Sequence, residues 1–138
     1  MVVQRQATTK LNSERFKVKY ELTTETTTPS AGSTLYRIRA LKDIPLYGVI
    51  VGDLGGFLES ETNLSQEDDC WVRDNAMVYG GAKVYGDALI KGEAQVFGYA
   101  RVYGDALVCG HARVGGNFRF SGDDMVSGLR DCSGLQLL

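Results

Sequence analysis

Residues 69–122 read DCWVRD-NAMVYG-GAKVYG-DALIKG-EAQVFG-YARVYG-DALVCG-HARVGG-NFRFSG, a unit of six residues that repeats almost to the C-terminus. Glycine ends every unit from Gly80 to Gly134. Alanine fills the second position at 76, 82, 88, 94, 100, 106 and 112, and a β-branched residue fills the fourth at 72, 78, 84, 90, 96, 102, 108 and 114. Such a short and strict period predicts one small unit stacked on itself, which is a β-solenoid.

The pattern Ala-x-Val within each hexad is strand periodicity, because side chains alternate between the two faces of a strand. Alanine and valine then point into a core, and the residue between them points outward. Glycine followed by Asp or Asn is turn chemistry, since both tolerate left-handed backbone angles. A helix is excluded, because a glycine at every sixth position costs about 1 kcal/mol each relative to alanine.

The hexads resemble the hexapeptide-repeat left-handed β-helix family, in which three hexads make one triangular coil. This resemblance implies an all-β fold, a left-handed parallel β-helix of a little under four coils. Three further segments, LYRIRALKDI (35–44), GDLGGFLESETNLS (52–65) and CWVRDNAMVYGGAKVYGDA (70–88), are similar to a group of hexapeptide-repeat proteins encoded by phages and prophages. Some members of that group are labelled acetyltransferases on the basis of fold alone.

The chain of 138 residues divides into four parts. We expect a frayed N-terminus (1–14), an N-terminal β cap with the segment leading into the repeat (15–68), the β-helix (69–134) and a C-terminal tail (135–138). Within the cap, alternating apolar residues predict strands over 16–22 and 36–40, joined by a threonine-rich link over 23–33. The apolar run 49–51 predicts a third short strand before the glycine-rich segment 52–56. The cap should cover the first coil, because an open solenoid end leaves backbone groups unpaired.

The net charge of −2 argues against a strongly basic nucleic-acid binder. No apolar stretch is long enough to span a membrane, and the first residues do not form a signal peptide.

Cys70 and Cys132 fall in inward positions several coils apart, and Cys109 falls at a corner. We therefore expect free thiols and a location in the reducing cytoplasm of a bacterial host.

If three hexads make a coil, residues 18 apart stack at roughly 4.8 Å and the outward side chains form columns. An apolar column contains Trp71, Leu89, Leu107 and Met125, a basic column contains Lys83, Arg101 and Arg119, and an acidic column contains Asp69, Asp87, Asp105 and Asp123. Corner aromatics pair Tyr79 with Phe97 and Tyr85 with Tyr103.

An outward apolar stripe is typical of an interface. The apolar column predicts a homo-oligomer, with a dimer favoured over a trimer, unless the cap folds down over the stripe. The basic column either binds an anion or an acidic partner or is a solvated face. The acidic column reflects turn chemistry after glycine, with a bound cation as the alternative.

His111 is the single histidine. Hexapeptide-repeat acyltransferases use a histidine as general base, which the near-neutral pKa of the imidazole suits. Here His111 occupies a regular corner above Glu93 and Asn75, and no loop interrupts the repeat to build a pocket for an acyl acceptor. One histidine also excludes the zinc site of the γ-class carbonic anhydrases, which share this fold. No catalytic residue, metal or cofactor is therefore expected.

The function favoured by the sequence is a non-enzymatic binding or assembly module of phage type. It would oligomerise and present a rigid face to a protein partner, such as a host defence component that it inhibits. The alternative is an acyltransferase that uses acyl-CoA, with His111 as its base.

Overall fold

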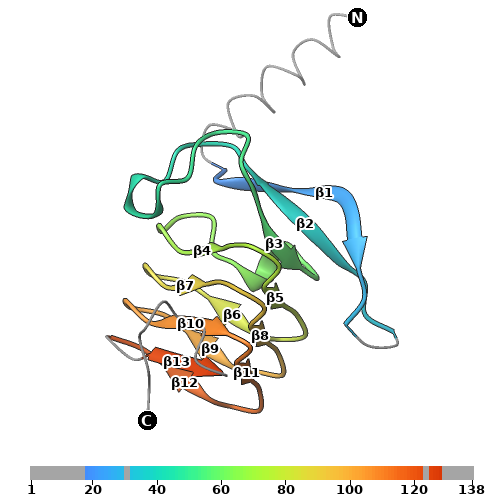
Figure 1. Cartoon of the computed structure of the whole chain (residues 1–138), viewed down its shortest axis with the longest axis vertical. Helices are drawn as coiled ribbons and strands as arrows, with labels where there is room; N and C mark the ends of the chain where they lie inside the picture. Colours follow the sequence, from blue (N-terminus) through green and yellow to red (C-terminus); the bar gives the residue numbers. More distant parts are fainter. Residues whose placement is uncertain (1–17, 30–31, 123–124, 129–138) are drawn as a thin grey trace, which may run out of the picture.

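The computed structural model describes residues 18–29, 32–122 and 125–128, and for 125–128 only the backbone. Figure 1 shows a small antiparallel cap at one end of a stack of short parallel strands. The cap contains β1 (Tyr20–Thr27), β2 (Leu35–Ala40) and β3 (Leu54–Leu58), with β2 pairing antiparallel to both of its neighbours. The prediction of an all-β solenoid with a β cap is confirmed, and the solenoid has about four turns.

The cap differs from the sequence prediction at two places. The threonine-rich segment expected as a link is strand as far as Thr27, because β-branched threonine fits an extended backbone. The run 49–51 is not a strand: a short 3₁₀ helix, η1 (Pro45–Tyr47), precedes it, and Val49 forms a single antiparallel bridge with Ile44.

The third cap strand instead passes through the glycine-rich segment, from Leu54 to Leu58. A Cβ atom added to Gly55 would lie 2.6 Å from the carbonyl oxygen of Val72, and one added to Gly56 would lie 2.5 Å from that of Ala76. The two glycines therefore allow β3 to lie directly against the first coil, a use of glycine that sequence alone does not separate from turn formation.

The solenoid contains ten short strands in the described residues: β4 (Trp71–Val72), β5 (Met77–Val78), β6 (Lys83–Val84), β7 (Leu89–Ile90), β8 (Gln95–Val96), β9 (Arg101–Val102), β10 (Leu107–Gly110), β11 (Arg113–Val114), β12 (Arg119–Phe120) and β13 (Met125–Gly128). They belong to three sheets and pair with one another in parallel. The cap-linked sheet has the order β1-β2-β3-β5-β8-β11, the Trp71 sheet β4-β7-β10-β13, and the basic sheet β6-β9-β12. Partners such as Leu89 and Leu107 lie 18 residues apart, which confirms three hexads per coil.

Parallel pairing begins ahead of Asp69. Phe57 and Leu58 of β3 pair with Met77 and Val78, and Leu64 forms a parallel bridge with Val84. The corner between them is a second 3₁₀ helix, η2 (Glu61–Asn63). The buried side chain of Asn63 donates to the carbonyl oxygen of Ala82 at 2.8 Å and accepts from the backbone N–H of Ser60 at 2.9 Å. The first coil therefore begins with residues that lack the hexad pattern.

The alanine and β-branched positions of the repeat point inward, as predicted, and all are buried from Val72 to Val114. Glycine is required at the corners because the coils stack so closely there. Gly86 has a φ of 68°, and a Cβ atom on it would lie 2.7 Å from the backbone nitrogen of Gly104 in the next coil. Both the backbone angle and the space exclude a side chain.

The cap closes the upper end of the solenoid with two buried polar side chains. The ammonium of Lys19 donates to the carbonyl oxygens of Asp68 and Cys70, each at 2.6 Å, and lies 3.3 Å from the Cys70 sulfur. The Tyr20 hydroxyl donates to the carbonyl oxygen of Leu64 at 2.6 Å. Burial lowers the pKa of Lys19 and raises the pKa of Tyr20 and of the Cys70 thiol. The carbonyl oxygens of Leu64, Asp68 and Cys70 are thereby hydrogen-bonded by side chains of the cap.

The cysteines behave differently from the sequence prediction. Cys70 is a buried free thiol, but Cys109 is disulfide-bonded. The argument for free thiols rested on distances within a regular repeat, and it does not apply to a partner outside the described residues. The disulfide removes that argument for a reducing compartment. No helix in the described ranges is long and apolar enough to cross a membrane.

Candidate functional site

The apolar column is covered at its upper end. Trp71 is 1% exposed and Leu89 is 8% exposed, while Leu107 is half-buried; the backbone of Met125 continues the column, but its side chain lies outside the described part. Tyr20 of the cap meets Trp71 edge to face, with ring centroids 6.5 Å apart. The cap therefore covers the apolar column at Trp71, which was the alternative to an exposed interface. A charge placed at Leu89 would perturb folding before it tested association.

The basic column is an exposed surface. Lys83, Arg101 and Arg119 are direct neighbours in the basic sheet, and all three side chains are exposed. Within the described residues no carboxylate forms an ion pair with any of them. The column is therefore a stack of three like charges without a counter-charge on this chain's described surface.

The corner aromatics stack as predicted. The rings of Tyr85 and Tyr103 are 4.9 Å apart and nearly parallel, and those of Tyr79 and Phe97 are 5.5 Å apart. Each ring therefore covers one face of its neighbour. The acidic column contains no metal cluster within the part of the chain that the structure describes, and Asp123 lies outside that part.

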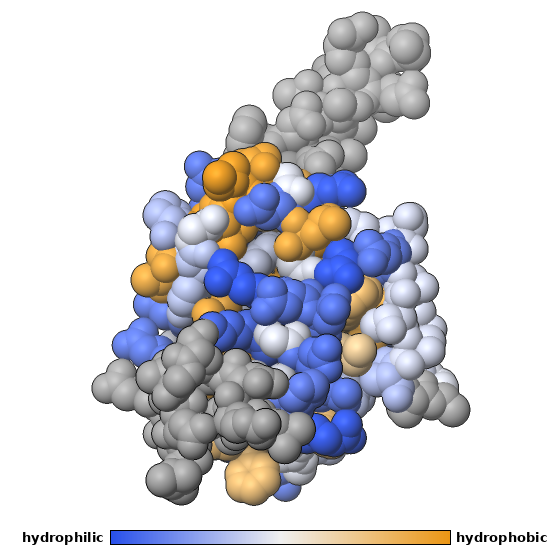
Figure 2. Space-filling view, viewed as in Figure 1, coloured by the Kyte–Doolittle hydropathy of each residue, from blue (hydrophilic) through white to orange (hydrophobic). Residues whose placement is uncertain are grey.

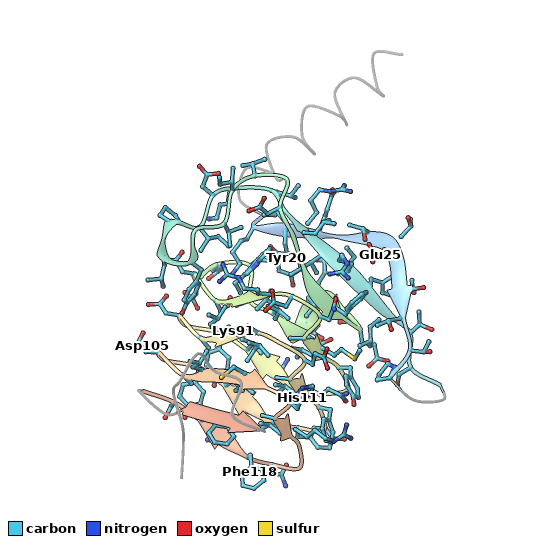
Figure 3. All side chains as sticks on the ribbon, viewed as in Figure 1. Tyr20, Glu25, Lys91, Asp105, His111 and Phe118 are labelled. Carbon is cyan, nitrogen blue, oxygen red and sulfur yellow. The ribbon has the colours of Figure 1, made fainter. Side chains whose placement is uncertain are left out.

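A pocket of about 570 Å³ lies on the cap-linked sheet, where the end of β1 extends beside the solenoid. In Figure 3, Glu25 on β1 and His111 on the solenoid lie on the same side of the molecule. The lining residues come from the cap (Thr26, Thr27, Phe57), from one corner column (Asn75, Glu93, His111) and from the adjoining strand column (Met77, Gln95, Arg113). The pocket thus brings together segments that are far apart in sequence.

His111 and Glu93 form a pair at the rim of this pocket. The Nδ1 atom of His111 lies 3.2 Å from Oε1 of Glu93, and the two side chains are 44% and 65% exposed. With Nδ1–H donating to the carboxylate, the neutral ring carries its lone pair on Nε2. This orientation of a histidine by a carboxylate is the arrangement that a general base requires.

Arg113 is held over the neighbouring part of the pocket. Its Nη1 donates to Oε1 of Gln95 at 3.1 Å, and its guanidinium lies 5.3 Å from the centre of the Phe97 ring. Gln95 Oε1 also accepts from the Tyr79 hydroxyl at 2.9 Å. Burial raises the pKa of Tyr79, and the nearby Arg113 opposes that shift. The hydroxyl therefore stays a hydrogen-bond donor and helps to fix Gln95.

Arg37 supports the wall of the pocket. Its guanidinium pairs with Glu25 at 3.0 Å, and it donates to the carbonyl oxygen of Gly55 at 2.7 Å and to Oδ1 of Asn75 at 3.0 Å. It also lies 4.2 Å above the Phe57 ring. Arg37 thereby connects the cap to the first corner of the column that contains His111.

Sequence reasoning placed Glu93 beneath His111 but missed the pocket. The spacing of 18 residues was the signal for the His111–Glu93 pair, and the same spacing relates Met77, Gln95 and Arg113 in the structure. No signal indicated that Thr26 and Thr27 would form the opposite wall, because that segment was expected to be a loop. The absence of an inserted loop in the repeat did not mean the absence of a pocket.

No protein-family model matches the chain. A curated protein of Escherichia coli (strain K12), named "Uncharacterized acetyltransferase YdcK", is 49% identical over 39 residues. The match covers 28% of this chain and 12% of that protein, so the similarity spans a small part of the relative. The β-solenoid and this local similarity together fit a hexapeptide-repeat protein.

Proposed function

We propose that the protein is an acyltransferase whose base is His111, which reverses the order of the two functions that the sequence suggests. The observation that carries the proposal is the His111–Glu93 pair, at 3.2 Å, in a pocket that the cap completes. The sequence favoured the other function because the single histidine occupies a regular corner and no loop interrupts the repeat to build a pocket for an acyl acceptor. Thr26, Thr27 and Phe57 supply that wall. The name of the Escherichia coli relative supports the same reaction class.

In this reaction, Nε2 of His111 removes a proton from a nitrogen or oxygen atom of the acceptor. The same acceptor atom attacks the carbonyl carbon of an acyl thioester. Glu93 accepts a hydrogen bond from Nδ1–H and stabilises the imidazolium that forms. The carbon–sulfur bond then breaks, and His111 returns the proton to the departing thiolate. The products are the acylated acceptor and a free thiol. The thioester donor is the part of the proposal that rests on the family resemblance.

The test is release of free thiol from acetyl-CoA in the presence of a panel of small amines and alcohols. We expect saturable turnover in the wild type and a loss of about 10²–10⁴-fold in kcat for His111→Asn, the range for removal of a general base. Glu93→Gln should lower kcat less, because the imidazole is kept. Arg101→Gln, an exposed change in the basic sheet, is the matched control and should behave as the wild type.

A His111→Asn variant with wild-type turnover would reject His111 as the base. Folded wild-type protein that neither binds nor turns over acetyl-CoA with any acceptor in the panel would reject the reaction class.

The second candidate is the binding and assembly module of phage type. It is supported by the basic column without counter-charge and by Leu46, Ile50, Val51 and Leu54, which are each more than half exposed around the cap. Figure 2 shows apolar surface near the cap end of the molecule. Such surfaces are typical of association sites. In this role the protein would form a homo-oligomer in the host cytoplasm and bind a host defence protein.

Mass measurement by light scattering and affinity capture from a host lysate test this candidate. A specific host protein whose capture requires Arg101 but not His111 would favour it over acyl transfer. A monomer that captures nothing would exclude it.

A further inference from the structure

We infer that the pocket selects a linear acceptor that carries both an amine and a carboxylate. The amine would lie at His111, and Arg113 would bind the carboxylate. This inference rests on the proposed acyl transfer and names its substrate class. The argument begins with the charges that face the pocket, which are the carboxylate of Glu93, the guanidinium of Arg113 and, when protonated, His111. A zwitterionic ligand matches one negative and one positive group.

Arg113 is the pocket cation that is available for a ligand. Arg37 stands nearby, but it is engaged by Glu25, by the carbonyl oxygens of Gly55 and Asp74, and by Asn75. Arg113 has no ion-pair partner among the described residues, and its hydrogen bond to Gln95 uses a single N–H of the five in a guanidinium. A planar guanidinium with unused N–H donors is suited to binding both oxygens of a carboxylate.

Arg113 is also held in place before a ligand arrives. Gln95 accepts its hydrogen bond at 3.1 Å, and the Phe97 ring lies 5.3 Å from the guanidinium carbon. A side chain that is already oriented loses less conformational freedom on binding. This arrangement makes Arg113 a specific anion subsite rather than one more surface cation.

The two groups lie close together in the chain. His111 is in the turn before β11 and Arg113 is the first residue of β11, and both line the pocket. Met77 and Phe57 provide apolar lining between the cap and the solenoid. Methylene groups between the amine and the carboxylate of a ligand would contact this apolar lining, which favours acids with several carbons between the two groups.

The probes are linear ω-amino acids from glycine to aminohexanoate, each compared with the alkylamine of the same length, which lacks the carboxylate. With acetyl-CoA as donor, we expect the longer amino acids to be acetylated more efficiently than the matching amines. Arg113→Gln should raise KM for aminohexanoate about ten-fold with little change in kcat, and should leave KM for hexylamine unchanged. Arg101→Gln should change neither.

Binding of aminohexanoate without a donor, followed by NMR titration, separates this inference from the proposed reaction. We expect Arg101→Gln, a change outside the pocket lining, to keep the wild-type affinity and Arg113→Gln to lose it. If Arg113→Gln binds and reacts like the wild type while turnover persists, the acid subsite is wrong and the acyltransferase stands. If no turnover occurs but binding depends on Arg113, the reaction is wrong and the selection of the acid as a ligand stands. If neither binding nor turnover depends on Arg113, the inference is overturned.

Discussion

Single polar side chains decide how the cap attaches to the solenoid. The hydroxyl of Tyr47, in η1, donates to the carbonyl oxygen of Asp87 in the second coil, and Arg73 donates to the carbonyl oxygen of Tyr47. Burial, with smaller contributions from the charges of Asp87 and Asp105, raises the pKa of Tyr47 to about 12. The folded protein therefore retains a proton that the unfolded chain would release near pH 10.

Tyr47→Phe tests this contact. At neutral pH the variant should lose about 1 kcal/mol, the usual value of one hydrogen bond. Because the folded pKa is the higher one, the contribution is complete below about pH 10 and is lost as the pH rises to about 12. Urea denaturation along a pH series should show a shallower alkaline loss of stability in Tyr47→Phe than in the wild type. Leu46→Ala, the exposed neighbour, should keep the wild-type slope, and an unchanged slope in Tyr47→Phe would contradict the assignment.

At the scale of the single strand, the same hexad position has two different environments. Ala100 is fully buried in the third coil, whereas Phe118, in the equivalent position one coil later, is 63% exposed. The interior between coils is close-packed, so it accepts the methyl group of alanine and little more. Where the alanine pattern ends, the side chain leaves the core.

Ala100→Gln should therefore destabilise the protein by about 3 kcal/mol or more, through overpacking and a buried amide without partners. Phe118→Gln places the same side chain in the same hexad position and should change the melting temperature little. Thermal melts followed by circular dichroism compare the two. Equal melting temperatures for Ala100→Gln and the wild type would reject the inward assignment.

At the scale of the whole molecule, the cap and the solenoid share one hydrophobic core. Tyr20, Ile38 and Ile44 of the cap belong to the same cluster as Trp71 and the inward valines of the repeat. The cap is therefore expected to unfold together with the solenoid. The pocket depends on this union, because its two walls come from the two parts.

Trp71→Ala is the sharpest test of the shared core. We expect a loss of about 3–5 kcal/mol, the range for deleting a large buried aromatic side chain, with one cooperative transition in near- and far-ultraviolet circular dichroism. Phe118→Ala removes an exposed aromatic ring and serves as the control. Two separate transitions in the wild type would show that the cap and the solenoid fold independently.

The six-residue period by itself determined the solenoid and the inward alanine and valine positions. The family resemblance added three hexads per coil, and with them the columns that place Glu93 under His111. These features are local or periodic, and a repeated pattern specifies its own neighbours. The tertiary structure alone decided that Trp71 is covered, that the first coil begins at Phe57, and that Thr26 and Thr27 complete a pocket with His111 and Arg113. Those contacts join segments without a common period, and they depend on how close Gly55 and Gly56 let the cap approach the first coil.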